Sequence, residues 1–385
     1  MQTVHVRLPA QPTKYDIKIG SGLIAQAGER LRAVVKSRSQ RAAVISNKKV
    51  FALFGEALMR ALRSSKFEVT VWLMKDDEQH KSLRSLEQAL NFFSESGIER
   101  DDIVVALGGG VVGDLAGFAA ATYLRGVAFI QIPTTLLAQI DASVGGKVAV
   151  NLPAGKNLVG AFHQPRLVLI DIDTLGTLPP RELTAGWCEA IKQGAVGDRS
   201  LFDQTFHLLQ ESGTDFSLWL NRRRFQSEIC AIIAAHCRFK ASVVAGDERE
   251  STSRNDASSR KILNFGHTTA HALEKVTGYK RFRHGEAVGY GMLVAGEISK
   301  KLGMLTTDAL ESLGQAVRTC GALPAANDIE IDRLMAAMKN DKKSIAGSVK
   351  WVLLEGIGKA RIVDGREISA QTLRKALRDG LQPLL

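Results

Sequence analysis

The pattern of apolar residues changes once along the chain, and this change restricts the folds open to it. Up to about residue 178, short apolar stretches alternate with segments whose apolar residues recur at three and four positions. Such alternation is typical of β-α-β units, which build a parallel sheet covered by helices. From Pro179 onward, strand-like stretches nearly vanish and helical periodicity dominates. The sequence therefore predicts a doubly wound, Rossmann-like α/β domain over residues 1–178 and an α-helical domain over residues 179–385.

The periodicity also gives approximate bounds for the elements. In the first half we expect an edge strand within 1–20, strands at 42–46, 68–74, 103–107, 128–132 and 167–170, and helices at 50–64 and 82–96. In the second half we expect helices at 182–196, 226–244, 268–276, 286–302 and 305–320, and a strand pair at 348–354 and 360–363. Pro179 and Pro180 mark the boundary, because neither continues a strand ladder or a helix interior.

Length and composition restrict the class of protein. A chain of 385 residues exceeds one ordinary hydrophobic core, so two domains are expected. Cys230 and Cys237 share a predicted helix face and are expected to pack in the core. No signal-peptide core is present and every apolar run ends before about 18 residues, so we expect a cytoplasmic protein without a membrane partner. The net charge of +11 comes from scattered Lys and Arg, which indicates no nucleic-acid partner.

A glycine-rich segment follows one of the predicted strands. Residues 101–107 lead into Gly-Gly-Gly-Val-Val-Gly-Asp at 108–114, and a helix rich in Ala and Gly follows. Gly108, Gly110 and Gly113 satisfy GxGxxG, a pattern that lets the backbone approach a pyrophosphate at a helix amino terminus. The acidic residue that usually follows about 20 positions later to bind a ribose is absent. The segment indicates either a nucleotide loop or a plain tight turn.

Three histidines and one isolated acid suggest a metal site in the second half. His267 and His271 are one helical turn apart, and His284 heads an apolar helical stretch. The spacing of the first two matches HExxH, but a threonine replaces the general-base Glu, which argues against a protease. Glu189, in an otherwise apolar turn, is the best third ligand for an open zinc site. It can also pair with Lys192 on the same helix face, and each histidine can be structural instead.

Basic side chains supply candidates for anion binding. Lys147 and Lys156 follow glycine-containing segments, and we expect both to project from flexible loops beside the nucleotide domain. The other candidates for a pocket that binds a phosphate and a carboxylate are Arg125, Lys192, Lys240, Arg260, Lys342 and Lys343. A nucleotide loop, a metal site and anion-binding side chains together suggest redox chemistry at a metal-bound carbinol.

Seven sequence blocks resemble the 3-dehydroquinate synthases, NAD- and zinc-dependent cyclases of the shikimate pathway. The blocks are GGGVVGDLAGFAAATYLRG, IPTTLLAQIDASVGGKVAVN, GKNLVGAFHQP, GWCEAIKQG, LNFGHTTAHALE, HGEAVGYGM and NDKKSIAG, in the family's order. The resemblance covers almost the whole chain. It implies a cytoplasmic, homodimeric carbon–oxygen lyase that converts the sugar phosphate 3-deoxy-D-arabino-heptulosonate 7-phosphate to 3-dehydroquinate and phosphate, with NAD oxidised only transiently.

The resemblance also assigns roles to individual residues. Its metal ligands, for Zn²⁺ or Co²⁺, would be Glu189, His267 and His284, with His271 near the substrate. Its catalytic residues would be Asp141, Lys147, Lys192, Asn264 and His271. Its substrate contacts would be Arg125 from the other subunit, Lys147, Asn157, Lys192, Lys240, Arg260, Asn264, His271, Lys342 and Lys343. Its NAD contacts would be Asn47, Asp77, Glu78, Lys81, Gly108, Gly109, Gly110, Val111, Gly113, Asp114, Thr134, Thr135, Lys147, Lys156, Thr174, Leu175 and Thr177.

Two departures from the family and three alternatives stay open at this point. The polar stretch before Leu263 is longer than usual, so either Arg260 or Arg254 fills the arginine role, and Asn47 stands where an acid usually lies near the adenosine ribose. The alternatives are a cyclase acting on sedoheptulose 7-phosphate or glucose 6-phosphate, a metal-dependent polyol dehydrogenase, and a non-catalytic NAD-binding regulator. Arg260, Asn264 and the Asp341-Lys342-Lys343 run favour the synthase, and no role follows for the late strand pair.

Overall fold

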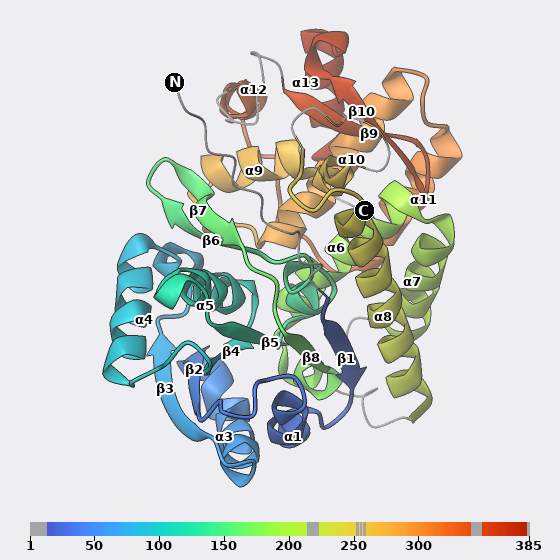
Figure 1. The fold of residues 1–385 in the computed structure, drawn as a ribbon. Helices are drawn as coiled ribbons and strands as arrows, with labels where there is room; N and C mark the ends of the chain where they lie inside the picture. Colours follow the sequence, from blue (N-terminus) through green and yellow to red (C-terminus); the bar gives the residue numbers. More distant parts are fainter. Residues whose placement is uncertain are drawn as a thin grey trace, which may run out of the picture.

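Six parallel strands form the central sheet of the computed structural model, which describes residues 14–213, 223–251, 254, 256, 259–339 and 349–382 (Figure 1). The strand order is β1-β8-β5-β4-β2-β3, and each of these pairings is parallel. The strands are β1 (Asp16–Gly20), β2 (Arg41–Asn47), β3 (Glu68–Met74), β4 (Ile103–Gly108), β5 (Ala128–Pro133) and β8 (Leu167–Asp171). The predicted α/β class is confirmed, and residues 1–13 lie outside the described part.

Helices cover both faces of this sheet. They are α1 (Ala27–Arg32), α3 (Glu56–Ser64), α4 (Leu83–Glu95) and α5 (Gly110–Thr122), with the short α2 (Lys48–Val50) before α3. Successive strand residues point to opposite faces. Thus Ala42 and Val44 pack with α1 and α3, whereas Ala43 and Ile45 pack with α4 and α5. This arrangement is doubly wound, as predicted.

A two-stranded ribbon lies beside α5. Its strands, β6 (Lys147–Leu152) and β7 (Gly155–Phe162), are antiparallel. The prediction that Lys147 and Lys156 lie on flexible loops is therefore wrong. Val148 and Val150 alternate inward and are buried, and a Cβ added to Gly117 of α5 would lie 2.4 Å from Val148 Cγ1. The ribbon is thus fixed against the sheet domain by close packing.

The second half is largely helical. Its helices are α6 (Pro180–Gly197), α7 (Arg199–Ser212), α8 (Arg223–Gly246), α9 (His267–Val276), α10 (His284–Lys301), α11 (Thr307–Thr319), α12 (Ile331–Lys339) and α13 (Ala370–Gly380). The predicted strand pair is present as antiparallel β9 (Lys350–Gly356) and β10 (Lys359–Asp364). Single turns include η3 (Glu78–His80), η4 (Tyr123–Arg125), η5 (Ala138–Ala142), η6 (Ile172–Thr177) and η8 (Arg260–Asn264).

One apolar cluster joins the sheet to the helices. Val168 and Ile170 of β8 belong to the same cluster as Leu183 and Ile191 of α6. Although α6 begins at Pro180, as the boundary prediction suggests, packing continues across that point. The division into residues 1–178 and 179–385 therefore stays a prediction.

Helix α8 is long and apolar enough, by length and composition, to cross a membrane. Its most apolar window is 44% buried within the molecule. The buried side of the helix includes His236 and Lys240, which form polar contacts with other elements. Partly buried helices of this kind also occur in protein cores, so the helix is weak evidence for a membrane span.

Candidate active site

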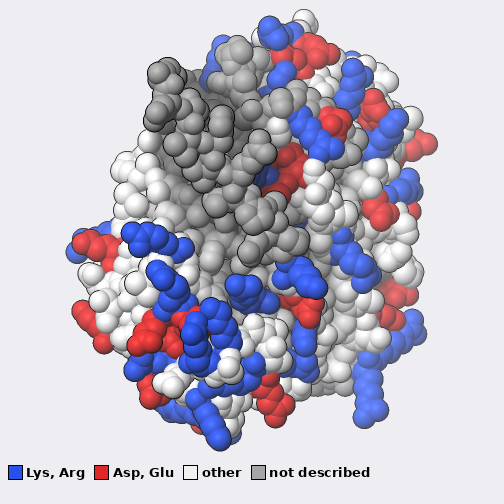
Figure 2. Space-filling model, in the orientation of Figure 1, with Lys and Arg blue, Asp and Glu red and all other residues white. Residues whose placement is uncertain are grey.

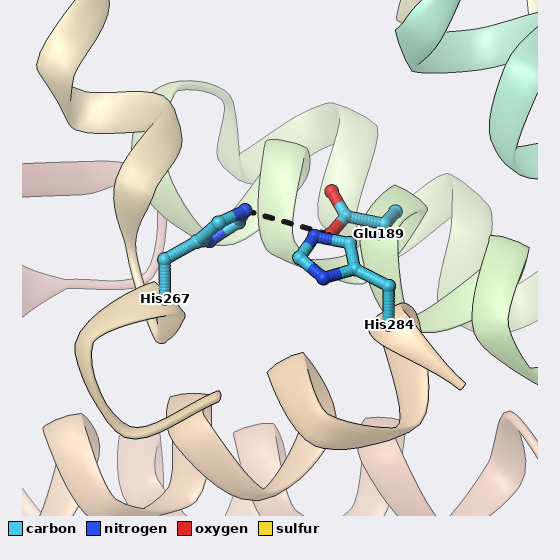
Figure 3. Close-up of side chains that lie close together, drawn as sticks. All are labelled: Glu189, His267 and His284. Atoms are coloured by element: carbon cyan, nitrogen blue, oxygen red, sulfur yellow. Dashed lines mark ion pairs between the residues drawn. The ribbon is translucent and has the colours of Figure 1, made fainter. Parts of the chain in front are cut away.

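Glu189, His267 and His284 converge from three helices (Figure 3). Each offers one ligand atom, and these atoms lie within 4.8 Å of one another. His267 Nε2 is 3.9 Å and His284 Nε2 is 3.8 Å from Glu189 Oε1. These are the residues that the family resemblance designates as metal ligands. His271 lies beside them, its ring centroid 5.6 Å from that of His267 and 6.1 Å from that of His284.

Close helix crossings bring these side chains together. Gly285 follows His284, and a Cβ there would lie only 1.9 Å from the backbone oxygen of Ala185 on α6. Gly266 precedes His267 with φ 79°, and a Cβ on Gly291 of α10 would lie 1.9 Å from its backbone oxygen. Real Cβ atoms do not approach this closely, so α6, α9 and α10 meet at a spacing that only glycine permits.

The donor set fits a divalent metal ion. Glu189 is 1% exposed, and within the described part of the chain its two carboxylate oxygens accept no hydrogen bond. Lys192 Nζ lies 2.6 Å from Glu189 Oε2 and forms an ion pair with it, but the angles are not those of a hydrogen bond. A buried carboxylate with so few partners is costly unless a cation offsets it. Two imidazoles and one carboxylate with a free fourth position make a typical catalytic zinc set.

A cluster of cations surrounds Asp141 on η5. Lys240 Nζ lies 2.9 Å from Asp141 Oδ1, and Lys240 is 6% exposed. Burial favours a raised pKa for Asp141, but Lys240 and Lys192 lower it below its ordinary value. Burial also lowers the pKa of Lys240; Asp141 opposes this shift, while Arg260 and Lys192 reinforce it. Lys240, Lys192 and Arg260 are all buried near Asp141, although Lys192 also pairs with Glu189, so an anion bound in this part of the site would be stabilised.

A second group connects β6 with the segment before α9. Lys147 Nζ forms an ion pair with Glu250, and Asn264 Nδ2 donates to Glu250 Oε1 at 3.2 Å. Arg260 donates to the backbone oxygens of Gly145 and Glu248, at 3.4 and 2.8 Å. Arg254 instead pairs with Asp256 at 2.9 Å. Arg260, which is 3% exposed, therefore lies nearer the other candidate residues than its rival does.

The glycine segment forms the expected strand–turn–helix, with β4 ending at Gly108 and α5 beginning at Gly110. A Cβ on Gly108 would lie 2.7 Å from Val112, and a Cβ on Gly109 would lie 3.0 Å from Thr135. A small pocket at this turn is lined by Gly108, Gly109, Gly110, Gly113, Asp114 and Gln131, among others. The absent side chains leave the backbone open, as a dinucleotide pyrophosphate requires.

The remaining candidates for cofactor binding gather at the carboxyl ends of the strands, the edge where α/β sheets bind ligands. Asn47 ends β2, Thr134 and Thr135 follow β5, and Thr174, Leu175 and Thr177 lie in η6 after β8. Asn47 accepts from Val50 N at 2.9 Å and donates to Asp76 at 3.2 Å. The Thr174 hydroxyl donates to Asp171 O at 2.7 Å and is buried. Both side chains are thus engaged within the protein.

A buried lysine organises the turn after β3. Lys81 Nζ lies 2.8 Å from Asp114 Oδ2, 2.6 Å from Asn157 Oδ1 and 3.4 Å from Glu78 Oε1. These four expected ligand-binding residues are therefore brought together. Asp77, in the same turn, has φ 139° and ψ 149°, a conformation nearly confined to glycine. Its side chain accepts from Gln79 N at 2.7 Å.

Among the predicted substrate contacts, Arg125, Lys342 and Lys343 stay predictions. Arg125 is exposed in η4, with φ 64°. Lys342 and Lys343 lie outside the described residues. Sequence reasoning missed four polar residues that contact the site; they are Gln193, His236, Glu250 and Glu274. Three of them are polar residues amid apolar helix positions, whereas Glu250 follows α8 and gave no such signal.

The structure combines a glycine turn that suits a dinucleotide with a cluster of two histidines and a carboxylate that suits a metal ion. Together they define a class of enzyme that uses both a dinucleotide and a metal. Solved structures of this class are similar over nearly their full length. The 2-epi-5-epi-valiolone synthase of Streptomyces hygroscopicus subsp. jinggangensis, with NAD⁺ and Zn²⁺ bound, has a TM-score of 0.84 and 26% identity, covering 97% of this chain and 99% of that one. A 2-deoxy-scyllo-inosose synthase with carbaglucose-6-phosphate, NAD⁺ and Co²⁺ has a TM-score of 0.81 and 23% identity, covering 95% and 97%.

Sequence comparison identifies the family. Residues 71–185 match the 3-dehydroquinate synthase N-terminal model, and residues 186–344 match the C-terminal model. The 3-dehydroquinate synthase of Rippkaea orientalis is 40% identical over 97% of this chain and 97% of its own length. This chain belongs to the 3-dehydroquinate synthase family, which confirms the predicted resemblance.

Proposed function

We propose that this enzyme is a carbon–oxygen lyase that converts 3-deoxy-D-arabino-heptulosonate 7-phosphate to 3-dehydroquinate and phosphate. The implied sequence is oxidation at C5, loss of phosphate from C7 by β-elimination, reduction at C5, ring opening and intramolecular aldol closure. The observation that carries the proposal is 40% identity across 97% of the chain, combined with a convergent Glu189, His267 and His284. The alternatives share the fold but are not favoured by this identity.

Bound NAD would supply reversible hydride exchange at C5, and a divalent ion would polarise the C4 and C5 hydroxyls. Glu189, His267 and His284 would hold the ion, which we propose to be Zn²⁺ or Co²⁺. The turn at Gly108 to Asp114 would hold the pyrophosphate.

The protein's own charges favour binding and elimination of anions. We infer that Lys240, Lys192 and Arg260 hold the anionic groups of the substrate, because all three are buried cations and burial lowers the pKa of Lys240 even with Asp141 beside it, a cost that a bound anion would offset. A fixed positive charge stabilises negative charge that develops when phosphate leaves, and costs little reorganisation. Lys147, released from Glu250, would reach the same anion. Asn264 and His271 would orient the ring hydroxyls beside the metal.

The test is phosphate release from 3-deoxy-D-arabino-heptulosonate 7-phosphate with added zinc and a small amount of NAD, while dehydroquinate and net NADH are followed. Many turnovers per NAD, with no net NADH, are expected. Release only from sedoheptulose 7-phosphate would make the chain a sister cyclase. Stoichiometric accumulation of NADH would make it a polyol dehydrogenase, and no reaction with any of these would support a binding role only.

We further propose a cytoplasmic homodimer in which Arg125 serves the neighbouring subunit. The support is that Leu124 and Arg125 are both exposed, so both are accessible to a neighbouring subunit. Light scattering at micromolar concentration tests the dimer.

On the face shown in Figure 2, basic and acidic side chains are interspersed, and the described residues of that face form no continuous basic track of the kind that nucleic acids bind.

A further inference from the structure

A second carboxylate lies behind the metal site. Glu274 on α9 is 3% exposed and is not among the three convergent donors. Its Oε2 lies 3.4 Å from His284 Nδ1, while its Oε1 lies 2.9 Å from Lys156 Nζ. The two nitrogens of His284 thus face different carboxylates, because Nε2 is 3.8 Å from Glu189 Oε1.

This geometry determines how the imidazole can act. A neutral imidazole carries one N–H and one lone pair, and a metal-binding histidine usually donates its N–H to a carboxylate, carbonyl or water. An ionised Glu274 has no hydrogen to donate, so it can only accept the N–H of His284 Nδ1. The lone pair of the His284 ring is then on Nε2. That is the atom directed toward Glu189 and His267.

The other oxygen of Glu274 connects this arrangement to the first half of the chain. Lys156 belongs to β7, and its ammonium lies 4.7 Å from the ring centroid of Tyr279 as well as contacting Glu274. A buried carboxylate is stable only when its charge is compensated. Lys156 supplies that compensation from the β6–β7 ribbon, which packs on α5 of the sheet domain.

We propose that Glu274 is a positioning residue for the metal ion: it fixes the tautomer and orientation of His284, and Lys156 holds it in place. The inference rests on the proposed function in one respect, that the three donors bind a metal. It makes the β6–β7 ribbon a structural part of the metal site. Replacing a residue of this kind is expected to weaken metal binding by about 10- to 100-fold.

The experiment measures zinc affinity of the full chain by competition with a chromogenic chelator. Glu274→Ala is expected to weaken zinc binding by about 10- to 100-fold, and Glu274→Gln, which keeps the shape but not the charge, by a smaller factor in the same direction. Lys156→Met should weaken it several-fold. The matched control is Glu297→Gln, which removes a carboxylate from the same helix as His284 where it pairs with Lys301 at 2.8 Å. Zinc affinity should not change in this control.

Cobalt absorption separates positioning from a loss of fold. The visible bands of Co²⁺ bound to folded Glu274→Gln should shift relative to the unmodified chain, because the ring of His284 is no longer held in one orientation. Unchanged zinc affinity and cobalt bands in both Glu274 variants would overturn the inference alone. If the unmodified chain binds no zinc, the proposed metal site fails and the inference with it.

Discussion

Glu189 and His271 lie in one cluster of side chains, yet their loss should have different consequences. Glu189→Ala removes one of the three proposed metal donors and leaves the buried Lys192 without its 2.6 Å partner. We expect loss of bound zinc and of turnover together. His271→Ala should retain zinc but lose turnover, because His271 stands beside the donors. Elemental analysis and turnover assays check both, and a full zinc complement in Glu189→Ala would refute the ligand assignment.

His236 should make the protein sensitive to acid. It lies 3.1 Å from Gln193 Oε1 and 3.0 Å from the Thr205 hydroxyl, and burial lowers its pKa from 6.5 to about 3. Between these values the unfolded chain binds a proton and the folded chain does not, so the free energy of unfolding falls as pH falls. From pH 6.5 to pH 5 this amounts to about 2 kcal/mol.

The comparison that isolates this effect uses His236→Asn, which keeps a donor toward Gln193 and does not titrate. Urea unfolding at pH 7 and pH 5 should show a smaller acid loss in the variant than in the unmodified chain. Equal losses would mean that other groups account for the acid sensitivity.

Among individual residues, the sequence indicated the proposed metal donors more clearly than the residues that support them. Glu189 was visible because it is a lone acid in an apolar helix turn, and the resemblance distinguished His284 from His271 as a ligand. Gln193 and Glu274 are also polar residues amid apolar helix positions, but that pattern did not reveal their role, because the role depends on which helix packs behind them. The strained Asp77 was equally hidden, since the sequence pattern alone does not give φ.

At the scale of elements, glycine determines whether three helices can meet. Gly291→Ala places a methyl group about where Gly266 O stands, at 1.9 Å, so α9 and α10 must move apart. We expect a loss of about 1–3 kcal/mol in the free energy of unfolding and weaker zinc binding, because His267 follows Gly266. Chemical denaturation and zinc titration measure the two effects.

A glycine-to-alanine substitution in α11 should instead raise the free energy of unfolding. Gly314 lies inside α11, and the nearest atom to a Cβ there is the flexible end of Arg318 at 3.7 Å. Gly314→Ala should stabilise the protein by about 0.5–1 kcal/mol, because alanine loses less backbone freedom in a helix, and should leave zinc affinity unchanged. If Gly291→Ala and Gly314→Ala both destabilise the protein, the close contact between α9 and α10 does not explain the effect of the first.

Elements with a strong period were predictable, and those shaped by their neighbours were not. The strand before Gly108 and the helices α8 to α11 follow apolar repeats. The β6–β7 ribbon was missed because its glycines are typical of loops, although Val148 and Val150 alternate as a strand requires. Helices α7, α12 and α13 were missed as well, because polar residues dominate their exposed faces.

For the whole molecule, we expect one unfolding transition in calorimetry. The apolar cluster that includes Val168 and Leu183 extends from the sheet into the helices. The sheet has two further clusters of its own, but this shared cluster joins the two halves, so they should unfold together. Zinc at 100 times its dissociation constant should stabilise the folded chain by about 2.7 kcal/mol and shift the whole transition upward. Two resolved transitions, only one of them moved by zinc, would contradict this expectation.

The control for the zinc shift is Glu189→Ala, whose transition temperature zinc should not change.

For the molecule as a whole, the change of apolar period near residue 178 was enough to predict the fold class. The subunit number and the compartment stay predictions, because neither follows from the packing of a single chain.

The position of β1 has a consequence for synthesis on the ribosome. Residues 16–20 emerge early, but β1 is an edge strand whose neighbour in the sheet is β8, residues 167–171. At about 5–20 residues per second, the edge waits on the order of 10 s for its partner. Unpaired strand edges invite association with other chains. A chaperone that binds nascent chains would therefore benefit this protein most during that interval, before the sheet closes at its last strand.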